Sequence, residues 1–305
     1  MQQHIVEIAS DAVHLSAHRG FMRIERDGAE IGRVPFADIA AVIVRGYGAS
    51  LSVNLCSRLS EAGAPMVICG ADQSPAALLW PVQGHYEQGR RMEAQASLSR
   101  PLRKRLWREL VIAKITAQAS VLNATSGADA RLERMAKEVL SGDSSNMEAQ
   151  AARRYWPLLM GKGFQRDRQA AGINAALNYS YTVLRAGAAR SILAAGLHPS
   201  LSIHHESRGD ALRLADDLME PFRPFVDWMV WQMTQKHEVA TLEPADKKHL
   251  ASILTLDLPG REGVSPVQIW LDRLAVSFAK ICIGEASDLE LPLPPSMLDL
   301  QQCRT

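Results

Sequence analysis

The stretch GFMRIERDGAEIGRVPF, residues 20–36, carries the clearest local signal for structure in this chain. Two strand-like runs flank Asp27-Gly28, a dipeptide that favours a tight hairpin turn because both of its positions tolerate positive φ. The stretch therefore predicts two antiparallel strands joined by a two-residue turn, so the N-terminal part of the chain should contain a β-sheet.

Further strand-like runs lie on both sides of this hairpin, and one helical segment, SVNLCSRLSEAG (52–63), interrupts them. That segment has apolar residues at helical spacing and ends on glycine. The additional strands are expected in HIVEI (4–8), AVHL (12–15), IAAVIV (39–44), PMVIC (65–69) and AALLWPV (76–82). We predict a small, mainly β domain over residues 1–95.

The pattern changes after about residue 100, where apolar residues recur with the 3.6-residue period of α-helices. Segments rich in Gly, Pro, Ser and Asn separate the periodic runs. The predicted helices span 101–122, 130–140, 146–160, 170–195, 210–238 and 266–283. The expected fold class is α+β, with the N-terminal β domain followed by a larger all-α domain over residues 96–305.

Composition places the chain among folded proteins but does not point to a partner. Of its 305 residues 47% are hydrophobic and 22% are charged, and the net charge is +1. A local excess of basic residues occurs in RRMEAQASLSRPLRKRLWREL (90–110), which either collects phosphates or forms a solvated helix face. The cysteines, Cys56, Cys69, Cys282 and Cys303, form no CxxC pair. Without a signal peptide or a long apolar segment, we expect a cytoplasmic protein in a reducing compartment.

Glu148 is the first acid that does not fit a solvated helix surface. Ser145 and Glu148 match the S-x-x-E capping box, which is one explanation for them. However, Glu148 also shares a helical stripe with Ala152, Tyr155 and Leu159, residues that pack inward. A carboxylate facing an apolar interior is costly unless a cation meets it, so a metal ligand is the second explanation.

The stretch HHESRGDALRLADDLMEPFRP (204–224) presents the same conflict. Asp217 and Glu220 lie one turn apart on the apolar side of a predicted helix, whereas Asp216 points away, where water is the expected neighbour. Pro221 should kink or end that helix beside Glu220. Carboxylates from two helices and an imidazole from the preceding loop predict a site for Mg²⁺ or Mn²⁺ rather than zinc. The sequence has no Walker loop, no G-x-G-x-x-G after a strand and no G-x-S-x-G elbow.

Several of these segments resemble the CRISPR-associated spacer-acquisition integrases, the metal-dependent adaptation endonucleases, especially those of type II systems. Residues 196–227 resemble the signature segment of that family, and 173–197 resemble the helix before it. Residues 147–159 are similar to the segment with the first acidic ligand, and 38–70 are similar to the family's β domain. The resemblance therefore covers most of the chain in the expected order.

The resemblance implies specific site residues and a specific reaction. Glu148, His205 and Glu220 would be both the metal ligands and the catalytic residues, with His205 acting as a ligand or as a proton shuttle. Asp217 would support the site or act as an alternate ligand, and Arg223 would either hold a phosphate or orient Glu220. The reaction would insert a short double-stranded DNA fragment into a CRISPR repeat by 3′-OH transesterification. The partners would be a second copy of the chain, bound through the β domain, and a small ferredoxin-like subunit.

Two alternatives remain open from the residues themselves. The same ligands would serve a metal-dependent nuclease that cuts branched DNA and never integrates it. Alternatively, the acids would act as caps and ion pairs in a non-catalytic DNA-binding scaffold.

Overall fold

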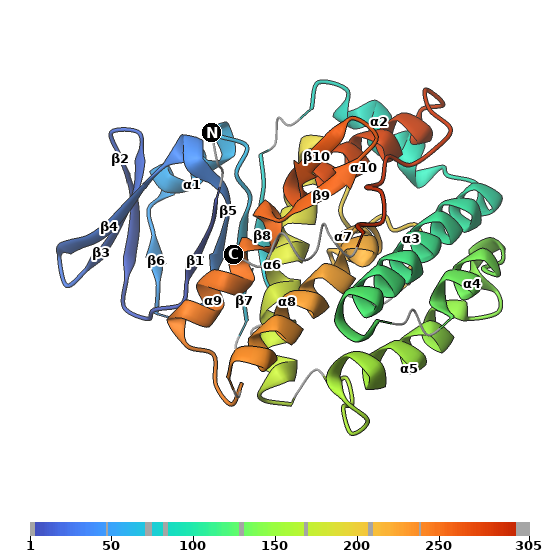
Figure 1. The fold of residues 1–305 in the computed structure, drawn as a ribbon. Helices are drawn as coiled ribbons and strands as arrows, with labels where there is room; N and C mark the ends of the chain where they lie inside the picture. The colour runs from blue at the N-terminus through green and yellow to red at the C-terminus, as the bar shows by residue number, and fades with distance from the viewer. Residues whose placement is uncertain are drawn as a thin grey trace. The chain divides into compact units, whose positions relative to one another are not determined.

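The chain divides into two compact units, Met1–Gln88 and Gly89–Thr305, whereas the expected boundary followed residue 95. We describe a computed structural model that covers 4–46, 48–70, 75–81, 85–127, 131–167, 170–206, 210–237 and 239–296. The α+β fold class is confirmed, because a β-rich unit precedes a helical one (Figure 1). Cys303, one of the four cysteines, lies outside the described residues.

The described part of the N-terminal unit forms two four-stranded sheets and one helix. The first sheet has the order β1-β5-β7-β8, with β8 antiparallel to β7 and the other pairs parallel. The second has the order β4-β3-β2-β6. The bounds are β1 His4–Ile8, β2 His14–His18, β3 Phe21–Arg26, β4 Ala29–Pro35, β5 Ile39–Val44, β6 Ser50–Leu51, α1 Val53–Glu61, β7 Met66–Cys69 and β8 Pro75–Leu79.

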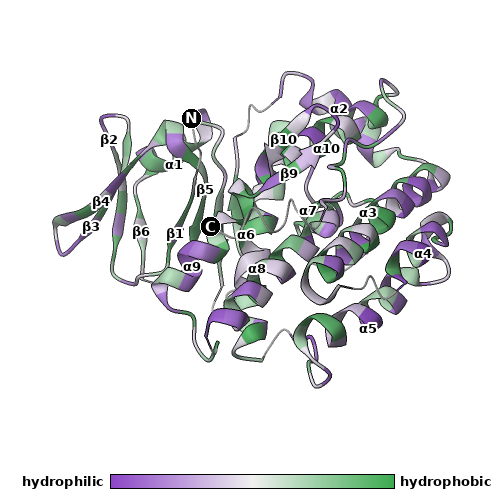
Figure 2. Ribbon diagram, viewed as in Figure 1, coloured by the Kyte–Doolittle hydropathy of each residue, from purple (hydrophilic) through white to green (hydrophobic). Residues whose placement is uncertain are grey.

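The predicted hairpin and buried strand are both present. β3 and β4 pair antiparallel around Asp27 and Gly28, which have φ values of 51° and 77°. All six residues of β5 are buried, and in Figure 2 this strand is hydrophobic (green). The core of the unit also contains Leu15 and Met22 from the second sheet and Leu55 and Leu59 from α1. Burial of these aliphatic side chains supplies the main driving force for folding this unit.

In its described residues, the C-terminal unit is helical apart from one short antiparallel strand pair. Its α-helices are α2 Gln88–Ala96, α3 Arg100–Ser126, α4 Leu132–Lys137, α5 Met147–Met160, α6 Ile173–Ala194, α7 Arg213–Met219, α8 Arg223–Lys236, α9 Pro244–Ala251 and α10 Val267–Cys282. The shorter elements of the chain are the 3₁₀ turns η1 Phe36–Asp38, η2 Ser141–Asp143, η3 Glu220–Phe222 and η4 Ser252–Thr255, and the strands β9 Asp257–Gly260 and β10 Gly263–Pro266.

Two long helices organise this unit. α3 packs against α4, α5 and α8, and α6 packs against α7, α8, α9 and α10. Gly187 permits the close approach on α6, since a Cβ there would lie 2.8 Å from the Leu254 side chain. Among the described residues, no helix has the length and apolar character needed to cross a membrane.

The predicted helix over 210–238 is interrupted where proline required it. α7 ends at Met219, the 3₁₀ turn η3 carries Glu220 and Pro221, and α8 begins at Arg223. Proline lacks the backbone N–H that would continue the α-helical ladder, so the chain tightens into this turn. Four features were not predicted from the sequence: α2, α9, β6 and the β9–β10 pair.

Candidate metal centre

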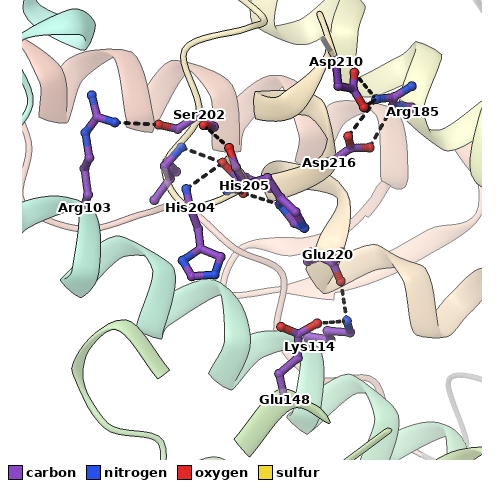
Figure 3. A network of polar contacts seen from close by, with 12 residues as sticks. Arg103, Lys114, Glu148, Arg185, Ser202, His204, His205, Asp210, Asp216 and Glu220 are labelled. Atoms are coloured by element: carbon purple, nitrogen blue, oxygen red, sulfur yellow. Dashed lines mark hydrogen bonds and ion pairs between the residues drawn. The ribbon is translucent and has the colours of Figure 1, made fainter. Parts of the chain in front are cut away.

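Glu148 and Glu220 converge on one buried ammonium group. Lys114 Nζ lies 2.5 Å from Glu148 Oε1 and 2.5 Å from Glu220 Oε2. The three side chains come from α5, η3 and α3, and Figure 3 shows the lysine between the two carboxylates. Two acids that are far apart in the sequence thus meet at a position occupied by positive charge.

The N-terminus of α5 fixes the position of Glu148. The backbone N–H groups of Met147 and Glu148 donate to the two carboxylate oxygens of Asp143, at 2.7 and 3.1 Å. This bridge satisfies donors that a helix start leaves unpaired. The capping-box interpretation of Ser145 and Glu148 is therefore wrong: Asp143 is the capping side chain, and the Glu148 carboxylate is turned to Lys114.

Glu220 is held by two cations in the interior of the unit. Its side chain is 2% exposed, and Arg223 Nη1 donates to Oε1 at 2.7 Å. Burial raises the pKa of this carboxyl, but Arg223 and then Lys114 outweigh that effect and lower it to about 2. Glu220 is therefore ionised at neutral pH. Within the described structure, Oε2 is buried without a hydrogen bond of acceptable geometry, although it is ion-paired with Lys114.

The His205 loop is organised around the fully buried carboxylate of Asp217. That carboxylate accepts hydrogen bonds from the backbone N–H groups of Ile203, His204 and His205, at 2.6, 3.1 and 3.2 Å. It also lies 2.7 Å from His205 Nδ1, and Ser202 Oγ donates to the His205 carbonyl at 2.5 Å. The carboxylate thus fixes both the backbone and the ring of His205.

The contact with Asp217 determines which His205 nitrogen can act on a ligand. Because a carboxylate only accepts, Nδ1 carries the proton, and in the neutral ring Nε2 keeps its lone pair. The hydrogen bond to Asp217 raises the pKa of His205 against the opposing effect of burial, and the charges of Asp217 and Glu220 raise it further. His204 instead stacks on Trp107, with ring centroids 4.2 Å apart.

A second polar cluster adjoins Arg223. The Arg223 guanidinium sits 4.4 Å from the centroid of the Tyr181 ring, and the Tyr181 hydroxyl donates to Asp227. Arg166 stacks on the same ring at 5.4 Å and donates to Asn178 Oδ1 at 2.5 Å. Arg223 is thus held by the Tyr181 ring as well as by Glu220.

The side chains of Glu148, Glu220 and His205 are of the chemical types that bind a divalent ion, but their positions do not form a complete site. Glu148 and Glu220 offer carboxylate oxygens, including the Glu220 Oε2 atom that lacks a hydrogen bond, and His205 offers Nε2. Oxygen donors with one imidazole suit Mg²⁺ or Mn²⁺. Yet the described residues contain no group of three His, Cys, Asp or Glu side chains placed to hold one ion together. Glu148 and Glu220 meet, and His205 does not complete the set.

The remaining sequence predictions have mixed outcomes. The prediction that Asp216 faces water is wrong, because Arg185 Nε and Nη2 lie 2.8 and 2.7 Å from its carboxylate. Most arginines of the basic stretch 90–110 make contacts within the protein. Backbone carbonyls accept hydrogen bonds from Arg91, Arg103, Arg105 and Arg108, and Glu285 is ion-paired with Arg90.

Sequence reasoning missed Lys114 as a member of this centre. Helical spacing could have indicated this residue, because Lys114 lies four residues from both Leu110 and Gln118 on a buried stripe of α3. A lysine on an apolar stripe requires an opposite charge for the same reason as a glutamate does.

Comparison with known proteins identifies similar chains along the full length. Residues 6–258 match the family described as CRISPR associated protein Cas1. The chain is 36% identical over 282 residues to the CRISPR-associated endonuclease Cas1 of Neisseria meningitidis serogroup C (strain 8013), covering 91% of this chain and 92% of that one.

Two solved structures share the fold. One, a casposase bound to integration product, has a TM-score of 0.79 at 18% identity and covers 99% of this chain and 98% of the casposase. The other, a chain of a Cas6-RT-Cas1–Cas2 complex, has a TM-score of 0.74 at 16% identity. It matches 96% of this chain, which in turn spans 36% of that longer one.

Proposed function

Because this chain belongs to the Cas1 family of CRISPR-associated proteins, we propose that it is a divalent-metal-dependent DNA integrase and endonuclease of CRISPR adaptation. It would insert short double-stranded DNA fragments into a CRISPR array by transesterification. The observation that carries the proposal is the convergence of Glu148 and Glu220 on one cationic position. The names of the Neisseria endonuclease and of the casposase bound to integration product support an activity on DNA.

Glu148, Glu220 and His205 would hold the ion, either Mg²⁺ or Mn²⁺. When bound, such an ion supplies Lewis-acid polarisation of a phosphate and lowers the pKa of an attacking hydroxyl. Asp217 keeps the His205 ring oriented, with Nε2 free to act, and Arg223 keeps Glu220 ionised and in place. Carboxylates that orient a ligating histidine in this way are a common feature of metal sites.

The reaction needs no external energy source. A DNA 3′-OH attacks a phosphodiester, forms a new P–O bond and displaces another 3′-OH, which takes up the proton that the attacking hydroxyl loses. One phosphodiester replaces another, so the protein must align the two strands and neutralise the charge of the transition state. If water attacks instead, the same site hydrolyses the strand and acts as a nuclease.

The proposed partners follow from family membership. A second copy of the chain would bind through the N-terminal unit, and a small ferredoxin-like subunit would join two such dimers. The solved Cas6-RT-Cas1–Cas2 complex supports an assembly with a second kind of Cas protein.

The experiment that tests the function uses a branched DNA that mimics a half-integrated fragment, incubated with the full chain and Mn²⁺ or Mg²⁺. Because the fragment is already joined, this substrate does not require the partner subunit. We expect strand resealing with loss of the branch on metal addition, and loss of the reaction in His205→Ala and Glu220→Gln. Glu206→Gln is the matched control, since Glu206 is exposed on the His205 loop.

The products separate the proposal from its alternatives. Cleavage of the branch without resealing would identify a branched-DNA nuclease. DNA binding without any metal-dependent reaction would favour a scaffold whose acids are structural.

A further inference from the structure

Lys114 is a buried charge whose partners are the two proposed acidic ligands. It projects from the middle of α3, its side chain is 11% exposed, and Nζ lies 2.5 Å from an oxygen of each carboxylate. Two carboxylates at this distance favour the charged form of the amine, so Lys114 is an ammonium ion at neutral pH.

An ammonium in this position and a divalent ion on the same oxygens exclude each other. Magnesium binds carboxylate oxygens at about 2.0–2.1 Å. An ion at that distance from Glu148 Oε1 and Glu220 Oε2 would compete for the same two oxygens as the nitrogen that lies 2.5 Å from both. Like charges at such a separation also repel strongly in a buried site. With Lys114 in place, the described residues have no three-ligand metal cluster.

We propose that Lys114 is a displaceable internal counter-ion, which pairs Glu148 with Glu220 in the metal-free protein and leaves that position when a divalent ion binds. The inference rests on the proposed function, because it takes these two carboxylates as metal ligands. Lys114 acts on the reaction through them and is thus a positioning residue.

The charge balance of the site shows what this exchange achieves. With the ion pairs of the structure, Lys114 and Arg223 match the two negative charges of Glu148 and Glu220. Without a cation between them, the buried carboxylate of Glu220 and the partly exposed carboxylate of Glu148 would repel each other and separate. Replacement of the ammonium by a divalent ion adds one positive charge at the centre, which favours the approach of a DNA phosphate.

The test compares the wild type with Lys114→Met, a variant of similar length without the charge. Binding of Mn²⁺ alone is measured by electron paramagnetic resonance of the free ion, in the absence of DNA. We expect Mn²⁺ to bind about tenfold or more tightly to Lys114→Met, since a competing unit charge has been removed. Lys137→Met, at an exposed position on α4, is the matched control and should bind as the wild type does.

The outcomes separate the two proposals. Equal Mn²⁺ affinity in wild type and Lys114→Met, or weaker binding by the variant, overturns the role of Lys114 and leaves the metal site intact. If neither protein binds Mn²⁺ while both are folded, the metal-dependent function fails as well.

A second measurement uses the wild-type chain and does not depend on how the variant folds. An amine-directed acetylating reagent is applied as a short pulse, and modification is read at each lysine by mass spectrometry. Lys114 should be protected without metal and at least severalfold more reactive at saturating Mn²⁺, whereas Lys137 should not change. Continued protection of Lys114 in the metal-saturated protein would contradict its displacement.

Discussion

Each buried carboxylate of the helical unit is matched to a different set of donors, and that set decides what the residue can do. Asp217 accepts three backbone hydrogen bonds and contacts His205, so its oxygens serve the loop. Glu220 is paired with two side-chain cations, one of which can exchange for another cation. Asp227 accepts a hydrogen bond from the Tyr181 hydroxyl, and burial is the strongest influence on the pKa of its carboxyl group.

Asp227 should make the stability of the protein depend on pH. Burial raises its pKa from 3.8 to about 6, against the hydrogen bond from Tyr181 and the charge of Arg223. Below pH 3.8 the acid is protonated whether the chain is folded or not. As the pH rises, the unfolded chain loses this proton first, so the stability contributed by the protonated acid is lost by the time the pH passes 6. The loss is on the order of 3 kcal/mol in the free energy of unfolding.

The variant Asp227→Asn isolates this contribution, because it keeps an acceptor for Tyr181 and cannot ionise. Denaturant unfolding at pH 4, 5, 6 and 7 should show the wild type losing stability relative to the variant as the pH increases. Asp257→Asn, at an exposed position on β9, is the control. A difference between wild type and Asp227→Asn that stays constant from pH 4 to 7 would contradict the raised pKa.

For single residues, the sequence predicted which acids need a positive partner better than it predicted which residue that partner is. Glu148 and Glu220 were recognised because an acid on an apolar stripe needs a positive partner. The sequence could not show that this partner is Lys114, since the pairing joins α3 to two elements that follow it in the chain. Asp216 was misjudged because its partner, Arg185, lies on α6.

Among the elements, α2 shows how polar side chains can form a buried face. Arg91 and Gln95 are the buried residues of α2, and they bond to the backbone at Ala195, His198 and Leu201. A periodicity search finds no apolar stripe in such a helix, so α2 was not predicted. α9 was missed for a related reason, because its buried residues are one leucine and one aspartate.

The N-terminal turns of α3 carry two exposed basic residues, Arg100 and Lys104, which lie one turn apart. We expect the double variant Arg100→Gln/Lys104→Gln to bind duplex DNA more weakly at every sequence tested. The slope of log affinity against log salt should become shallower by about 2, since two phosphate contacts and their released counterions are lost.

Fluorescence anisotropy over a series of salt concentrations measures that slope. The control is Lys248→Gln/Lys280→Gln, which removes the same charge from exposed positions on α9 and α10. If the two double variants lose affinity equally, the attraction is a general charge effect and the start of α3 is not a specific contact. An unchanged slope in Arg100→Gln/Lys104→Gln would likewise show that the start of α3 does not contact DNA phosphates.

For the whole molecule, the change of period from strands to helices predicted that a β-rich unit precedes a helical one. The N-terminal unit has its own aliphatic core around β5, and the proposed metal ligands all belong to the helical unit. A bound metal should therefore stabilise the helical unit, since a ligand stabilises only the cooperative unit whose folded form binds it.

Metal and protein concentration should accordingly act on different units. A Mn²⁺ concentration 100 times the dissociation constant should stabilise the helical unit by about 2.7 kcal/mol. Five of the six tryptophans lie there, at positions 107, 156, 228, 231 and 270, so intrinsic fluorescence follows its unfolding by denaturant.

Protection of the backbone amides of Ile39–Val44 from hydrogen exchange should respond little to Mn²⁺. It should increase with protein concentration, because the proposed dimer forms through the N-terminal unit. Chelation of the metal should reverse the stabilisation of the helical unit. It should not change the protection of Ile39–Val44. If Mn²⁺ raised the stability of both units equally, they would unfold as one cooperative structure. If protection of Ile39–Val44 were independent of protein concentration, dimerisation through that unit would be contradicted.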